Sequence, residues 1–278
     1  MKWVALGGVG LLLLACGSVG TEPVREGSLS VLTYNVAGLP AELSNSDPVA
    51  NHPQISSRLN SYDLVLVQED FAYHDLLASE ARHPNQSLPK EAVRGMNDGL
   101  NRFSQSPFGP LLRETWTACN GIIDDSSDCL ADKGFSMAVH NLAQGVDLHV
   151  YNLHLDAGRE DADFRARSQQ VQQLLDALAL HSSNAALLVV GDQNMKLINT
   201  PVDDPSLYAR LIEEGGLSDA CTEVDCGDPR YDRIMMRSSE KLLLTVQSWS
   251  LPGEFIDSDG EDLSDHEPVH VGLDWLAR

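Results

Sequence analysis

The chain has 278 residues, 42% of them hydrophobic, and a formal net charge of −22 at pH 7. This length suits one large α/β domain or two small ones. The acidic balance excludes a broad electrostatic grip on nucleic-acid backbones, so we expect no tight nucleic-acid binding. A phosphodiester substrate is still admissible, because bound divalent cations reverse the local field at a carboxylate-lined site.

The N-terminal residues predict export. Residues 1–15 hold one lysine and an apolar run too short to span a bilayer, which is typical of a signal peptide. Residues 13–16 (LLAC) resemble a bacterial lipobox, in which the signal is cleaved before a cysteine that is then lipidated. We therefore expect a lipidated Cys16, a tether over residues 16–28, and attachment to the bacterial cell envelope, at the outer membrane. A plain signal peptide, with secretion, is the alternative.

Eight strand-like runs and one clear helix follow the tether. The helix is predicted over residues 161–181, where apolar residues recur at helical spacing above a polar face. Residues 83–128, rich in Pro, Asn, Gly and Ser, predict long surface connections, which we expect to influence substrate selectivity. This mixture predicts one α/β domain over residues 29–278 with a large mixed sheet. The strand-like runs are 30–36, 63–69, 135–141, 146–156, 185–194, 231–238, 243–251 and 269–273.

Four cysteines remain once Cys16 is set aside, an even number for an oxidising compartment. Proximity along the chain favours two local disulfides, Cys119 with Cys129 and Cys221 with Cys226, although four cysteines allow three connectivities. A zinc site is the alternative. It is disfavoured because no histidine lies at ligand spacing beside either pair.

Polar residues interrupt the apolar runs at or near several strand ends. In YNLHLD, the two-residue period of a strand places Asn152, His154 and Asp156 on one face. Ligands commonly gather beyond such strand ends, and oxygen donors with few imidazoles suit Mg²⁺ or Mn²⁺. The set therefore predicts metal-assisted phosphoryl chemistry. Its members are Asn35, Glu69, His154, Asp192, Asn194 and His266.

The order of the motifs resembles the endonuclease/exonuclease/phosphatase superfamily, whose fold resembles that of deoxyribonuclease I. The resemblance extends from residue 30 to the last residue. It implies a four-layer α/β sandwich, with two mixed β-sheets packed face to face and helices on the outside, and a divalent-metal phosphoesterase activity. The motifs are LTYNVAGLP (32–40), VQED (67–70), NLHLDAG (152–158), GDQN (191–194), YDRI (231–234) and SDH (264–266).

The resemblance also implies a metal-binding group. Glu69 would be the principal metal ligand, and Asn35 would assist it or contact the phosphate. Asp265 would lie near the water shell of the metal or at a second metal position. The bound cation would polarise the phosphoryl oxygen and stabilise the leaving group.

The catalytic group follows from the same resemblance. Asp192 would orient and activate the attacking water, and Asn194 would donate to a phosphate oxygen. His154 would contact the scissile phosphate and stabilise the charge that develops there.

His266 needs a carboxylate partner, and its neighbour Asp265 is a poor one. Consecutive residues of an extended segment point to opposite sides, so Asp265 faces away from the ring if residues 264–266 are extended. The resemblance instead places Asp232 on an adjacent strand with its carboxylate toward His266. There it would fix the tautomer of the ring and stabilise the imidazolium during proton transfer.

The substrate is less sharply indicated. NVAGLP, and the HL motif followed by FRARSQQVQQL, resemble sphingomyelinases, whereas YDRI resembles the deoxyribonuclease branch. No exposed paired-aromatic hairpin for bilayer insertion is evident in the sequence. We expect a monomeric phosphodiesterase or phosphatase acting on a phospholipid or nucleotide, sphingomyelinase-like, with a deoxyribonuclease-like nuclease as the alternative. A catalytically inactive surface-binding lipoprotein is disfavoured because no residue of the site is missing.

Overall fold

The computed structural model describes residues 1, 25–44, 46–93, 95–121, 128–227 and 230–278. Residues 2–15 of the predicted signal peptide and Cys16 lie outside the described residues. The first described strand begins at Glu26, inside the span predicted to be a tether. No described helix is both long enough and apolar enough to cross a membrane.

In the part of the chain that the structure describes, twelve strands form two six-stranded sheets, in the orders β11–β12–β1–β2–β4–β3 and β5–β6–β7–β8–β10–β9. The first sheet contains β1 (Glu26–Asn35), β2 (Leu64–Gln68), β3 (Asn85–Gln86), β4 (Asn101–Ser104), β11 (Leu242–Ser250) and β12 (Val269–Ala277). The second contains β5 (Leu112–Thr115), β6 (Gly134–Ala143), β7 (Val146–His154), β8 (Leu187–Asp192), β9 (Ser218–Asp219) and β10 (Asp232–Arg237). Both sheets are mixed, since β1 runs parallel to β2 and β7 runs parallel to β8 while the other pairs are antiparallel.

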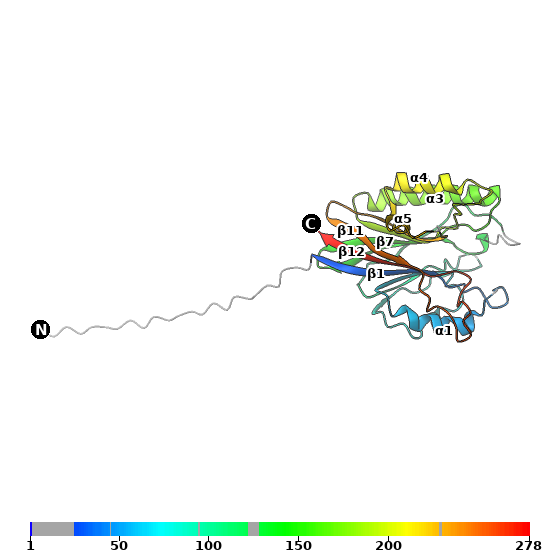
Figure 1. Cartoon of the computed structure of the whole chain (residues 1–278), viewed down its shortest axis with the longest axis horizontal. Helices are drawn as coiled ribbons and strands as arrows, with labels where there is room; N and C mark the ends of the chain where they lie inside the picture. The colour runs from blue at the N-terminus through cyan, green and yellow to red at the C-terminus, as the bar shows by residue number, and fades with distance from the viewer. Residues whose placement is uncertain (2–24, 45, 94, 122–127, 228–229) are drawn as a thin grey trace.

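Helices cover the outer faces of both sheets (Figure 1). Helices α3 and α4 lie together over the second sheet, and α1 lies over the first, which gives the four-layer sandwich that the sequence predicted. The helices are α1 (Pro48–Leu59), α2 (His74–Ala78), α3 (Asp161–Ser182), α4 (Asp204–Gly215) and α5 (Ala220–Glu223), with a 3₁₀ turn, η1 (Asp128–Leu130).

Local sequence accounts for where the two long covering helices begin. The carboxylate of Asp47 accepts a hydrogen bond from Ala50 N at 3.1 Å, and Pro48 occupies the first turn of α1. At the start of α3, Glu160 and Asp163 form a reciprocal capping box. These caps satisfy backbone donors that a helix leaves free at its first turn.

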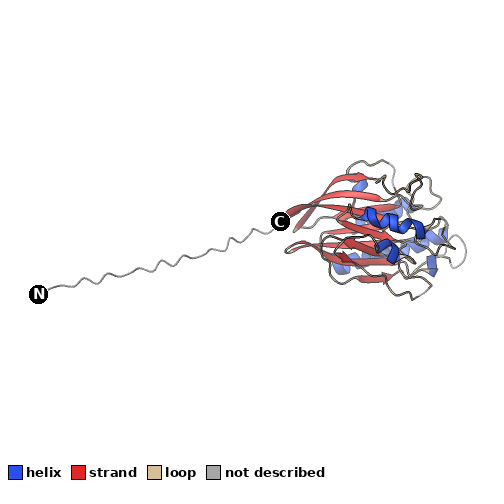
Figure 2. Cartoon of the chain, turned by 90° about the horizontal axis from the view of Figure 1, so that it is seen from below, coloured by secondary structure: helices blue, strands red, loops and turns tan. Residues whose placement is uncertain are grey.

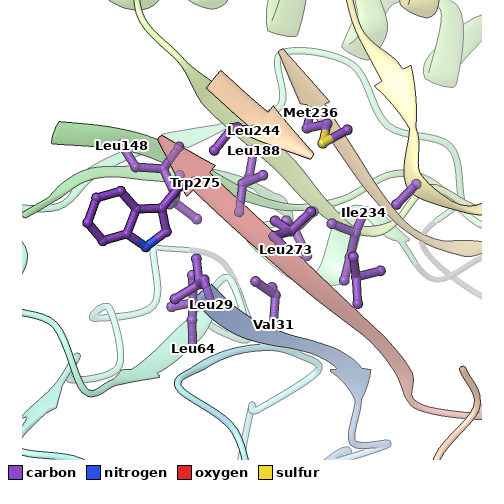
Figure 3. Close-up of a cluster of buried hydrophobic side chains, with 14 of the residues drawn as sticks. Leu29, Val31, Leu64, Leu148, Leu188, Ile234, Met236, Leu244, Leu273 and Trp275 are labelled. Carbon is purple, nitrogen blue, oxygen red and sulfur yellow. The ribbon is translucent and has the colours of Figure 1, made fainter. Parts of the chain in front are cut away.

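The apolar core between the sheets draws from both of them. Val31 on β1 and Leu64 on β2 pack in one cluster with Leu188 on β8 and Ile234 on β10 (Figure 3). Two further clusters join each sheet to its covering helix. Burying one such side chain stabilises the fold by roughly 1.5–3 kcal/mol, so the apolar strand interiors fix the strands and leave polar residues to their ends.

The strand ends that carry polar residues lie at one end of the molecule. The C-terminus lies at the other end (Figure 2), and β1 begins beside it, because Glu26 pairs with Leu276. Because β1 is parallel to β2 and β7 to β8, the carboxyl ends of each pair meet at the same edge of their sheet. This is the geometry that the sequence pattern required.

The eight predicted strands correspond to β1, β2, β6, β7, β8, β10, β11 and β12, and the predicted helix is α3. The expectation of surface connections throughout 83–128 was wrong in part, because β4 lies there fully buried and pairs with β2. Its four residues, NRFS, carry no apolar pattern. Arg102 is buried by donating to Ser136 and to Val150 O rather than by packing, so a hydrophobicity-based prediction misses the strand.

Both predicted disulfides are present. The structure pairs Cys119 with Cys129 and Cys221 with Cys226. The alternative reading of these cysteines as zinc ligands is therefore wrong.

Candidate active site

Strand register brings three predicted site residues to one level of the second sheet. His154 at the end of β7 pairs with Asp192 at the end of β8, and Asp192 pairs with Asp232 at the start of β10. From the first sheet, Asn35 Nδ2 donates to Asp192 Oδ2 at 3.2 Å and to Glu69 Oε1 at 3.1 Å. The two sheets therefore meet in a single polar cluster.

Glu69 reaches this cluster from a constrained turn after β2. Its φ is 58°, in the left-handed region that residues other than glycine rarely adopt. Gly38 N and Phe71 N both donate to Glu69 O, at 3.0 and 2.8 Å. Gly99 approaches so closely that a Cβ there would lie 3.0 Å from Glu69 Cα. The surroundings thus hold the turn, and the Glu69 side chain remains 20% exposed, open to a ligand.

Asp192 is the centre of the cluster and is almost fully buried. Its Oδ2 lies 3.3 Å from His154 Nε2, 3.3 Å from Asn194 Nδ2 and 3.8 Å from His266 Nε2. Its Oδ1 accepts from Asn194 N at 2.9 Å. Burial alone would raise the pKa of Asp192, but the charges of His154 and His266 hold that pKa well below its ordinary value. Asp192 is therefore an ionised acceptor.

Asp232 and His266 form the pair that the sequence predicted. Asp232 Oδ2 lies 2.7 Å from His266 Nδ1, which leaves Nε2 of the ring facing Asp192. Burial lowers the pKa of His266, but the carboxylates of Asp232 and Asp192 outweigh it and raise that pKa to about 10. Burial and the nearby charge of Asp192 raise the pKa of Asp232. The carboxylate orients the ring and stabilises its protonated form.

Lys133 is a site residue that sequence reasoning missed. Its Nζ lies 3.1 Å from His154 Nε2, and it forms a buried ion pair with Asp128. Burial lowers the pKa of Lys133, but the charges of Asp128 and Glu69 raise it overall, so the amine is protonated. A signal was available, because Lys133 lies two residues before the predicted strand 135–141. The antiparallel register, with Phe135 opposite Leu153, brings the start of that strand to His154.

Asp156, which was predicted to be structural rather than catalytic, holds together two segments next to the site. Its carboxylate accepts from Asn120 N at 2.6 Å and from Gln170 Nε2 at 2.7 Å. It thus links the segment of the Cys119–Cys129 disulfide to α3. Burial and the charge of Asp128 raise the pKa of Asp156 to about 6.

Asp265 lies apart from the buried cluster. It is exposed, and its Oδ1 accepts from Ser264 Oγ at 3.4 Å. Together with Lys196, Tyr231 and His266 it lines a cavity of about 410 Å³ beside the cluster. Its predicted role near the metal therefore remains a prediction.

The donor set fits a hard divalent cation. Ligand atoms of Asp192, Asp232 and His266 lie within 4.8 Å of one another. Asn35 joins Glu69 to this group, since its Nδ2 donates to both Glu69 and Asp192. Asp232 Oδ1 is buried and has no hydrogen-bond partner among the described residues. Closely spaced carboxylates are oxygen ligands that Mg²⁺ prefers, whereas Asn35 turns its amide nitrogen to the site and its Oδ1 accepts from Ala37 N at 3.1 Å.

Sequence comparison finds relatives with a shared name. No protein-family model matches the chain. The sphingomyelinase of Mycobacterium bovis is 32% identical over 285 residues, which cover 94% of this chain and 55% of the relative. A sphingomyelinase of Mycobacterium tuberculosis matches at the same identity and coverage. The chain therefore spans about half the length of these curated relatives.

Solved structures share the fold. Sphingomyelinase C from Streptomyces griseocarneus is 22% identical with a TM-score of 0.62, over 88% of this chain and 99% of that one. A beta toxin from Staphylococcus aureus with bound magnesium ions is 16% identical with a TM-score of 0.65, over 91% of this chain and 100% of that one. An endonuclease/exonuclease/phosphatase from Beutenbergia cavernae is 16% identical with a TM-score of 0.63, over 90% of this chain and 72% of that one.

The paired mixed sheets, the site at their shared end and these likenesses together define the fold. The chain has the deoxyribonuclease I-like fold, which it shares with the endonuclease/exonuclease/phosphatase from Beutenbergia cavernae. The relatives that it matches in sequence are named sphingomyelinases.

Proposed function

We propose that the chain is a divalent-metal-dependent phosphodiesterase of the sphingomyelinase type, which hydrolyses the phosphodiester of a phospholipid by attack of water. One observation carries the proposal. Both sheets deliver their polar strand ends to Asp192, which lies within 3.8 Å of Asn35, His154, Asn194 and His266. The likeness to mycobacterial sphingomyelinases supports the choice of substrate class.

Glu69 and Asp192 would hold Mg²⁺ or Mn²⁺, Asn35 would assist them, and Asp265 would serve the solvent side of the metal region. When bound, the cation polarises a phosphoryl oxygen and stabilises negative charge on the leaving oxygen. Asn35, as placed, donates its amide protons to both carboxylates and keeps them close together.

The remaining residues of the site act on water, phosphate and protons. Asp192, ionised and accepting, orients a water molecule for attack. Asn194 presents amide protons on the same side, and Lys133, with its Nζ 3.1 Å from His154 Nε2, places positive charge where the phosphate would lie. His266 holds or moves a proton at Nε2, since Asp232 occupies Nδ1. Such preorganised charge is commonly the largest single contribution to catalysis.

A substrate panel tests the proposal. Sphingomyelin, other phospholipids, DNA, RNA and inositol phosphates are each incubated with the protein in Mg²⁺ and in EDTA. Hydrolysis of sphingomyelin that requires Mg²⁺ supports the proposal. Cleavage of DNA in preference to phospholipid would favour the nuclease alternative, and no turnover of any substrate would favour an inactive binding protein.

The proposed enzyme is an exported, lipid-anchored monomer. Residues 1–16 support export and anchoring, and the two disulfides are consistent with an oxidising compartment. Metabolic labelling with palmitate tests the anchor. Label that is incorporated into the intact chain and lost in Cys16→Ser supports it, and label that persists in Cys16→Ser contradicts it.

A further inference from the structure

Large hydrophobic side chains are exposed on several loops around the site. Leu43 is 66% exposed, Val93 83%, Leu130 37% and Ile198 53%. We call these four residues the apolar rim. The other exposed large hydrophobic residues of the described chain are Met1, Val49, Leu88, Leu180, Val224, Ile256 and Leu276.

Two members of the apolar rim lie on the loops that follow Asn35 and Asn194. The Leu43 loop is attached to the Glu69 turn by Gly38 N, which donates to Glu69 O at 3.0 Å, and Ala41 N donates to the hydroxyl of Tyr73, just before α2, at 2.9 Å. Ile198 follows Asn194 by four residues and lines the same cavity as His266. These two side chains therefore border the site on different sides.

The other two members border the site beside Lys133. Val93 N donates to Asp132 Oδ2 at 2.7 Å, and Asp132 immediately precedes Lys133. Leu130 lies between Asp128 and Lys133, and its carbonyl accepts from Met96 N at 3.0 Å. Each rim residue is thus fixed to a segment that carries a site residue, and none of the four belongs to the closed core.

The opposite end of the molecule supplies exposed apolar residues for comparison. Leu180 is 77% exposed near the C-terminal end of α3. Leu276 is 40% exposed near the end of β12, where it pairs with Glu26 at the start of β1. Neither residue lies near the site, so both serve as controls of the same chemistry.

The negative charge near the apolar rim indicates which kind of lipid surface the rim can bind. The loop that leads to His266 carries the exposed acidic residues Asp259, Glu261, Asp262, Asp265 and Glu267. These carboxylates would repel an anionic membrane, whereas the outermost groups of phosphocholine lipids are cationic and complement them. The rim therefore fits a zwitterionic phospholipid surface.

We propose that the apolar rim docks the catalytic end of the protein against a zwitterionic phospholipid layer, so that lipid headgroups are presented to Asp192 and His266. The proposal rests on the proposed phospholipid substrate. In this arrangement, aliphatic side chains on separate loops make the apolar contact with the lipid layer that a single apolar hairpin could make. Aliphatic groups that enter the interface contribute binding in proportion to the apolar area that they bury.

The test compares two sets of substitutions in residues 25–278, which contain every described helix and strand and both disulfides. A signal peptide or acyl chain would itself bind vesicles, so this domain is the informative protein. The rim variant carries Leu43→Ser, Val93→Ser, Leu130→Ser and Ile198→Ser. The control variant carries Leu180→Ser and Leu276→Ser. Binding to phosphatidylcholine vesicles is measured by sedimentation in EDTA, and turnover of soluble bis-p-nitrophenyl phosphate is measured in Mg²⁺.

We expect the rim variant to lose at least about tenfold in vesicle affinity while its soluble-substrate turnover and melting temperature match those of the control variant. Equal vesicle affinity of the two variants would overturn the proposal, as would stronger binding to phosphatidylserine vesicles than to phosphatidylcholine vesicles. A loss of soluble turnover in the rim variant would instead assign these residues to the catalytic site. Intact vesicle binding without hydrolysis of sphingomyelin would contradict the proposed activity and leave the docking surface standing.

Discussion

Asp232 Oδ2 lies 2.7 Å from His266 Nδ1, although the two residues are 34 positions apart and His266 has another aspartate beside it in sequence. The neighbouring Asp265 is exposed and accepts a hydrogen bond from Ser264 instead. Residues 263–266 form a bend rather than an extended segment, and the His266 ring is oriented by a carboxylate at the start of β10, which leaves Nε2 to face Asp192.

Removing either member of the pair should disable proton transfer. We expect Asp232→Asn and His266→Ala each to lower kcat by about 10²–10⁴-fold with the fold intact, as for other general acid–base groups. The measurement is the steady-state rate on a soluble phosphodiester, with circular dichroism as the check on folding. Asp274→Asn, an exposed position on β12, is the matched control and should remain active. Near-normal rates in Asp232→Asn would remove the pair from the mechanism.

Lys133 should matter for turnover and not only for stability. We expect Lys133→Met to lower kcat about 10²-fold, since it removes a fixed positive charge 3.1 Å from His154. The single change also leaves Asp128 buried without its cation, which costs stability. The double variant Asp128→Asn/Lys133→Met removes both charges, so it should recover much of the melting temperature but not the rate. Recovery of the rate in the double variant would show that Lys133 is only structural, and Lys241→Met is the exposed control.

Divalent metal should stabilise the folded chain. Binding to the native state alone raises the free energy of unfolding by about 2.7 kcal/mol at a ligand concentration of about 100 times Kd. For a domain of this size we expect roughly 5 °C or more in Tm when Mg²⁺ replaces EDTA. Differential scanning calorimetry checks this without any assay of activity. Glu69→Gln should abolish the increase, and an equal increase in Glu69→Gln would contradict its role as the principal ligand.

The stability of the metal-free protein should depend on pH through His266. The carboxylates of Asp232 and Asp192 raise its folded pKa to about 10, above the ordinary value of 6.5. A raised histidine pKa stabilises the fold fully below the unfolded pKa, and this contribution is lost as pH rises through the folded pKa. We therefore expect the difference in unfolding free energy between the intact chain and His266→Phe to shrink between pH 7 and pH 10. A difference that grows over this range would contradict the assignment.

The strand ends could be predicted from the sequence because a buried strand stays apolar until it leaves the core. In apolar strands such as residues 187–190, burial leaves little freedom, so the first polar residues mark where the strand leaves the core, at Asp192 and Asn194. The partner of His266 could not be derived from spacing alone. It depends on the pairing of β10 with β8, and it was anticipated only through the superfamily resemblance.

Other features could not be predicted, because their stability comes from contacts between distant polar residues. Arg102 is fully buried in β4 by acceptors on β6 and β7, among them Ser136 and Val150 O, so its own sequence gives no apolar signal. Lys133 likewise becomes a site residue through its contacts with Asp128 and His154. A charged residue at a strand start is normally solvated, and only the tertiary fold shows otherwise.

The central claim is a metal-dependent phosphodiesterase of the sphingomyelinase type centred on Asp192. The most direct measurement is the release of phosphocholine from sphingomyelin by the purified protein, in Mg²⁺, in EDTA, and with Asp192→Asn in Mg²⁺. We predict release in Mg²⁺ alone, with EDTA and Asp192→Asn each reducing it by orders of magnitude. Equal release in EDTA, unchanged release by Asp192→Asn, or no release by the folded protein in Mg²⁺ would contradict the claim.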